Sequence, residues 1–287
     1  MDTVTFGYTG QGFAISLLQQ RKSVYEYINL FTLQLIGYII RFAPFLQKNN
    51  KSYILCYHSV SNSGWRFSTK TVDFEAQIKY LKNNYAIYSI SEILAGKKGI
   101  AITFDDGYED IYTNALPILK KYGITATVFV IGDSKNPNRD KMDNNLELLN
   151  LSQISLLKEA GWEIGFHTQT HPSLIELSDE ELEQELIIGK KDTETKLGIE
   201  LHYIAYPLGL YNKKVLNYVK KAGYTAGFTI NGGSVKTKNK YTIDRVGIEG
   251  TLSIHQFKGF MSPIGLFISK QFMKVLQLKE FITHLLS

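Results

Sequence analysis

The chain has 287 residues, 44% of them hydrophobic and 21% charged, and its formal net charge at pH 7 is +5. A chain of this length and composition can bury a large core in one domain of α/β-barrel size. The modest, dispersed positive charge gives no footprint for nucleic-acid binding. The single cysteine, Cys56, lies in an apolar run, which predicts a buried core residue, and it excludes a disulfide within the chain.

The first 50 residues are predicted to form an apolar helical segment. Between 28 and 46 apolar side chains cover almost every face, but polar residues and Pro44 leave the cleanest stretch shorter than the roughly twenty residues that span a bilayer. Asp2 replaces a basic start and no clear cleavage site follows, so a cleavable signal peptide fits poorly. We expect a cytoplasmic or membrane-associated protein, and an extracytoplasmic site stays open.

Short apolar runs alternate with segments of helical spacing through the middle of the chain. The predicted strands are 53–57, 100–104, 126–131, 163–166, 203–206 and 225–229, and the predicted helices are 74–85, 111–122, 152–160, 178–197 and 213–222. The helix from Ser178 has a capping residue followed by acids, and it is expected to end near Gly198. This alternation predicts an α/β fold with a largely parallel sheet and helices outside it.

A C-terminal amphipathic helix is predicted to begin at Ser262 and Pro263, which suit the N-cap and first helical positions. Its apolar stripe, with Lys270 off that stripe, is typical of a helix on a membrane surface. Packing on the barrel or on the N-terminal segment fits the same pattern. The predicted division of the chain is 1–50, 51–258 for the main domain, and 259–287 for this helix.

Two pairs of polar residues carry the chemistry. Asp105 and Asp106 follow one apolar, strand-like run, and His167 and His171 follow another. Alone, an Asp-Asp-Gly sequence is usually a turn, and a His-x-x-x-His sequence is usually structural or on the surface. However, the carboxyl ends of parallel strands open on one rim, where such residues converge. One carboxylate and two imidazoles can hold a divalent ion with open positions, which leaves the second carboxylate free as a base.

These residues also carry a family resemblance. The sequences at 103–108 and 167–172 resemble the first and second motifs of the NodB-homology polysaccharide deacetylases, and 205–209 resembles the third. The opening at 54–60 and 74–81 is similar to the branch that includes poly-N-acetylglucosamine deacetylases, in which a motif found elsewhere near the C-terminus precedes Asp-Asp. The resemblance implies a distorted, incomplete (β/α)7-type barrel, with additional helices at both ends of the chain.

The resemblance also implies the roles of the residues. In a metal-dependent hydrolase that removes N-acetyl groups from a sugar polymer, Asp106, His167 and His171 would bind the metal. Asp105 would act as the base on the attacking water. His58 would be the acid that protonates the leaving amine, although a structural histidine is the alternative.

The third motif would supply part of the oxyanion and substrate site, through Pro207, Leu208 and Gly209 and a backbone N–H of Leu208. In many members this motif begins with an arginine that orients the base, but Ala205 stands there in this chain. Arg245 takes over that role or binds Asp105, or else it forms an ordinary surface ion pair with Asp244 or another acid.

The metal and the substrate stay open at this point. Aspartate and histidine ligands suit zinc, but also cobalt, nickel or iron. The same chemistry, or deformylation, on a membrane-held glycolipid or lipid-linked sugar would suit the apolar termini, with peripheral membrane contact. The last alternative is an inactive carbohydrate-binding protein on the same fold. A free Asp105 beside a complete ligand set argues against it.

Overall fold

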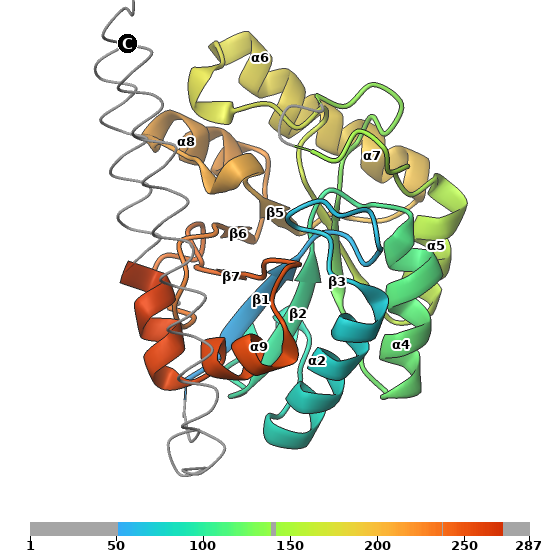
Figure 1. Ribbon diagram of the computed structural model, residues 1–287. Helices are drawn as coiled ribbons and strands as arrows, with labels where there is room; N and C mark the ends of the chain where they lie inside the picture. Colours follow the sequence, from blue (N-terminus) through green and yellow to red (C-terminus); the bar gives the residue numbers. More distant parts are fainter. Residues whose placement is uncertain (1–50, 139–141, 237, 272–287) are drawn as a thin grey trace, which may run out of the picture.

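The computed structural model describes residues 51–138, 142–236 and 238–271, and within them one sheet of seven strands curls into an incomplete barrel (Figure 1). The strand order is β6-β5-β4-β3-β2-β1-β7, and all neighbours are parallel. The strands are β1 Tyr53–Tyr57, β2 Ile100–Phe104, β3 Thr127–Val130, β4 Glu163–Phe166, β5 Tyr203–Ala205, β6 Ala226–Phe228 and β7 Val246–Gly247. This arrangement confirms the predicted (β/α)7-type barrel, and β1, β2 and β4 have the predicted bounds.

The strand β7 was not predicted, because two residues show no periodicity. It pairs with β1, where Val246 lies opposite Leu55. Just before it, Ile243 forms a parallel bridge to Phe228 at the end of β6. Residues 243–247 therefore link the two edges of the sheet and bring the closing segment beside β1.

Helices lie outside the sheet, as the alternation predicted (Figure 1). They are α2 Thr71–Asn84, α3 Ile90–Leu94, α4 Leu116–Lys121, α5 Leu151–Glu159, α6 Asp179–Glu183, α7 Gly189–Leu197, α8 Lys213–Lys221 and α9 Ile254–Phe260. The short helices α3 and α9 were not predicted, since fewer than two full turns give little periodic signal. The predicted boundary between 258 and 259 falls inside α9.

Two predicted helices contain a π-helical turn that sequence periodicity did not indicate. The turn Ile111–Ala115 precedes α4, and the turn Gln184–Ile188 separates α6 from α7. The predicted ends are correct, because the Ser178 side chain caps α6 by accepting from the Glu181 N–H, and Gly198 ends α7 with a φ of 63°. Single-turn π segments occur frequently near functional sites.

The C-terminal helix begins as predicted at Pro263, with the Ser262 hydroxyl accepting a hydrogen bond of 2.9 Å from the Gly265 N–H. Its described part ends at 271 and contacts the barrel, where Lys270 lies 3.4 Å from a carboxylate oxygen of Asp244. Residues 272–287 of the predicted helix and the predicted segment 1–50 lie outside the described residues. Among the described residues, no helix combines the length and the apolar character that a membrane span requires.

The inside of the barrel is filled in layers. Ile54, Phe129 and Phe228 belong to a small buried cluster that is separate from the large core beneath the helices. Because side chains alternate along a strand, Cys56 shares the face of Ile54 and lies one layer nearer the carboxyl ends. A methyl group on Gly165 would lie 2.5 Å from the Phe129 ring, so the ring needs a glycine opposite it.

Substituting Gly165→Ala should therefore lower the free energy of unfolding by about 1–3 kcal/mol, the usual cost of overpacking a core. The matched control is Gly247→Ala, where the nearest atoms belong to the flexible Ile230 side chain at 3.1 and 3.3 Å. Urea denaturation of both variants measures the difference. Equal losses of stability in the two variants would show that the Phe129 ring moves aside as easily as the Ile230 side chain.

Candidate active site

Polar side chains from three strand ends meet at the carboxyl rim of the barrel. His58 follows β1, the pair Asp105 and Asp106 follows β2, and His167 follows β4. His171 comes four residues later on the same loop. The structure thus brings together the four residues to which the sequence pattern assigned chemistry and His58, whose role the resemblance implied.

Asp106 lies at the centre of one group of possible ligands. Its Oδ1 is 3.3 Å from His167 Nε2 and 3.4 Å from His171 Nε2. His167 Nδ1 lies 2.9 Å from the Ala205 carbonyl oxygen, which can only accept, so Nδ1 donates and Nε2 is the nitrogen directed at Asp106, where it would bind a cation in the neutral imidazole. All three residues offer a ligand atom within 4.8 Å of the others. This donor set fits a divalent cation.

The protonation of this group also suits a cation. Burial opposes ionisation of Asp106, but the His167 hydrogen bond and the neighbouring imidazoles hold its pKa below the ordinary value. Burial lowers the pKa of His171 to about 4, which keeps its imidazole neutral. Burial opposes protonation of His167, yet the carboxylates of Asp105 and Asp106 raise its pKa. The group therefore favours a positive charge at its centre.

Backbone strain gathers at the same place. Within the described residues, the non-glycine residues with positive φ are Asp106, Thr168, His171 and Leu208, at 66°, 67°, 66° and 59°. Such angles are costly for residues with a Cβ and persist only where the surroundings enforce them. One such constraint is a hydrogen bond of 3.0 Å that the Thr168 hydroxyl accepts from the His171 N–H.

Asp105 is held by Arg245 rather than by the ligand group. Arg245 Nη1 and Nη2 each donate a 2.6 Å bond to one oxygen of Asp105, and both residues are buried. Burial would raise the pKa of Asp105, but the guanidinium outweighs it and holds that pKa well below the ordinary range. The surface ion pair considered for Arg245 is therefore wrong, and the ionised carboxylate lies beside the ligand group without belonging to it.

The guanidinium of Arg245 is itself fixed on every side. It donates to Thr103 Oγ1 at 3.1 Å and to the Thr229 carbonyl at 3.2 Å. Its central carbon lies 5.0 Å from the centre of the Phe129 ring, a cation–π contact. The closing segment thus delivers one rigid arginine beneath Asp105.

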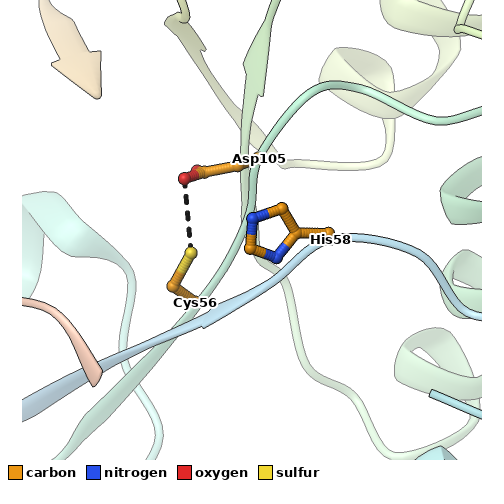
Figure 2. Close-up of side chains that lie close together, drawn as sticks. All are labelled: Cys56, His58 and Asp105. Atoms are coloured by element: carbon orange, nitrogen blue, oxygen red, sulfur yellow. Dashed lines mark hydrogen bonds between the residues drawn. The ribbon is translucent and has the colours of Figure 1, made fainter. Parts of the chain in front are cut away.

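His58 lies close to Asp105 and Cys56 (Figure 2). Its ring stacks on Phe67 at 5.0 Å between centroids and meets the edge of Trp65 at 5.7 Å. Burial lowers the pKa of His58, and the carboxylates of Asp106 and Asp105 oppose that effect. Cys56 Sγ donates to Asp105 Oδ2 at 3.3 Å.

The third motif forms a 3-10 turn, Pro207–Gly209, directly after β5. The hydrogen bonds recorded in this turn use the N–H groups of Gly209 and Leu210, whose acceptors are Tyr206 and Pro207. No hydrogen bond to another described residue occupies the N–H of Leu208. A donor for a developing oxyanion needs such an unoccupied N–H.

Two buried carboxylates that support the site were missed in the sequence. Asp110 accepts from the Ser59 hydroxyl at 2.5 Å and the Val60 N–H at 3.0 Å, next to His58. Glu185, in the π turn Gln184–Ile188, accepts from the N–H and the hydroxyl of Thr170 at 2.9 and 2.6 Å. For Asp110 the only available signal was its place just after Asp-Asp-Gly-Tyr, and for Glu185 there was none.

Comparison with known proteins gives consistent results. A family model described as polysaccharide deacetylase matches residues 94–227. The Bacillus subtilis protein YxkH, which is named as a polysaccharide deacetylase, is 31% identical over 228 residues, or 76% of this chain and 78% of YxkH. The poly-β-1,6-N-acetyl-D-glucosamine N-deacetylase of Staphylococcus aureus is 32% identical over 246 residues, or 74% of this chain and 83% of that enzyme.

Among solved structures, the Streptococcus pyogenes deacetylase PplD in complex with acetate has a TM-score of 0.63 and 28% sequence identity. The similarity covers 74% of this chain and 99% of PplD. Both the sequence relatives and this structure carry deacetylase names, and the described barrel presents Asp-Asp and His-x-x-x-His at one rim. This chain therefore belongs to the polysaccharide deacetylase family and is a hydrolase of N-acetyl amide bonds.

Proposed function

We propose that this protein removes N-acetyl groups from a polymer of N-acetylglucosamine, with a divalent cation held by Asp106, His167 and His171. The observation that carries the proposal is the separation of two carboxylates at one rim. Asp106 lies among the imidazoles, whereas Asp105 is ionised and held apart by Arg245. The name of the Staphylococcus aureus relative supports the choice of polymer.

Two imidazoles and one carboxylate favour zinc, with cobalt, nickel and iron as substitutes. When bound, such a cation polarises the acetyl carbonyl and lowers the pKa of a nearby water. Asp105 then accepts the proton of the attacking water. Pairing with Arg245 makes Asp105 a weak base. A water whose pKa has been lowered can still give its proton to such a base. In return, the bidentate contact fixes the direction of the carboxylate.

The other two steps belong to backbone and imidazole groups. The N–H of Leu208 donates to the oxyanion that forms at the acetyl carbon. His58 then protonates the sugar nitrogen, because an amide anion is too poor a leaving group to depart alone. The stacking of His58 on Phe67 holds the imidazole in place beside Asp105.

The two alternatives gain no specific support. Action on a membrane-held glycolipid or lipid-linked sugar rested on the apolar termini, most of which lie outside the described residues. An inactive binding protein does not agree with relatives named as deacetylases, nor with the ionised Asp105 beside the ligand group.

Zinc-reconstituted protein should release acetate from β-1,6-linked N-acetylglucosamine oligomers. His171→Ala should lose most of its bound metal and its activity, because two remaining ligands hold a divalent ion weakly. His255→Ala, at an exposed position on α9, is the control and should keep both. Elemental analysis and an acetate assay measure the two quantities. Unchanged metal content in His171→Ala would overturn the ligand assignment, and acetate release only from other glycans would overturn the substrate.

Asp105→Asn should keep its metal while turnover falls about a hundredfold or more, the usual contribution of a positioned base. It also leaves Arg245 buried without its partner, which should destabilise the protein by about 3–5 kcal/mol. The double variant Asp105→Asn with Arg245→Met removes both charges and should regain much of that stability without regaining turnover. Loss of the activating metal from Asp105→Asn would instead make Asp105 a ligand of the same ion as Asp106.

His58→Ala should slow deacetylation of an N-acetyl sugar about a hundredfold or more, which is typical for loss of a general acid. An activated aryl acetate ester should be affected far less, because its phenolate departs without a proton. The ratio of kcat/KM values for the two substrates measures the difference. Equal losses on both substrates would mean that His58 is structural.

A further inference from the structure

A second group of possible metal ligands lies next to the first. Cys56, His58 and Asp105 offer sulfur, nitrogen and oxygen atoms within 4.8 Å of one another (Figure 2). The group shares no residue with Asp106, His167 and His171. Cys56 and His58 come from β1 and its end, and Asp105 comes from the end of β2.

We propose that Cys56, His58 and Asp105 form a second, inhibitory site for a soft divalent cation such as zinc or cadmium. Thiolate, imidazole and carboxylate together are ligands typical of tetrahedral zinc. The fourth position would be left to water.

The distances agree with such a site. A tetrahedral zinc with Zn–S of about 2.3 Å and Zn–O of about 2.0 Å holds the two ligand atoms about 3.5 Å apart. Cys56 Sγ and Asp105 Oδ2 are 3.3 Å apart. The buried Nδ1 of His58 has no hydrogen-bond partner in the described part of the chain, so a shift of the imidazole breaks no bond at that atom.

Binding of the cation would release one proton. The cation takes the place of the thiol proton, which now lies between sulfur and Oδ2 and leaves to solvent. The new thiolate neutralises one of the two positive charges of the cation, and the carboxylate of Asp105 is shared between the cation and Arg245. The cation would replace the Arg245 Nη2 bond at Oδ2, while Oδ1 keeps its 2.6 Å bond from Nη1. Burial raises the pKa of the Cys56 thiol well above its ordinary value, so the thiolate forms only when the cation binds.

A cation at this site would occupy both Asp105 and His58. The inhibitory effect therefore rests on the proposed function, in which these residues are the base and the acid. The binding itself does not depend on those roles, because it follows from the three ligand atoms alone. Excess zinc should stop the enzyme without displacing the ion held by Asp106.

Cadmium tests the binding directly, because a bond from sulfur to cadmium gives an ultraviolet charge-transfer band and the chain has only one cysteine. Metal-free wild-type protein titrated with cadmium should develop this band. Cys56→Ser, which keeps a donor to Asp105 but offers no thiolate, should not develop it, and Cys56→Ala should behave in the same way. His171→Ala should keep the band. Absence of the band in the wild type, or its loss in His171→Ala, would overturn the second site.

A zinc titration tests the inhibition. Wild-type acetate release should rise with the first equivalent and fall as zinc increases further. Cys56→Ser, compared with its own maximum, should rise and remain high. The same decline in both proteins would overturn the inhibitory role. A protein that shows the cadmium band but releases no acetate at any zinc level would overturn the proposed function while keeping the second site.

Discussion

The buried ion pair between Arg245 and Asp105 is the interaction on which the rest of the site depends. Two charges removed from water are tolerated only when nearly every donor and acceptor is satisfied. Here Thr103, Thr229 and both carboxylate oxygens accept from the guanidinium, and Phe129 lies under it. The same contact joins the closing segment, residues 243–247, to the end of β2. The barrel therefore closes and Asp105 gains its ion-pair partner at the same time.

The strained backbone has a related explanation. Asp106 and His171 both have positive φ, and Asp106 Oδ1 lies 3.3 Å from His167 Nε2 and 3.4 Å from His171 Nε2. The cost is offset by hydrogen bonds that fix the loops from outside, above all those that Glu185 accepts from Thr170. The loops that carry possible ligands are thus held by buried carboxylates on neighbouring elements, in keeping with a preorganised site.

Local sequence signals accounted for most of the fold and for the set of residues at the rim. Strand runs, capping by Ser178 and the spacing of His167 and His171 are short-range features, and each could be seen in the sequence. The role of Arg245 could not be settled, because its partner is 140 residues away and the expected arginine position holds Ala205. Other features could not be predicted for the same reason, since they exist only through tertiary contacts. They are the two-residue β7, the π turns and the support from Asp110 and Glu185.

The late position of the closing segment has a consequence for synthesis of the protein. Asp105 leaves the ribosome long before Arg245, since 140 residues separate them. A contact between residues so far apart in sequence forms late, because the entropic cost of closing the loop comes before the free energy gained from packing. The nascent chain therefore carries an open barrel and an unpaired carboxylate until almost all of the described barrel has emerged. The Arg245 contact that fixes the direction of the Asp105 carboxylate can form only after this closing segment has been made.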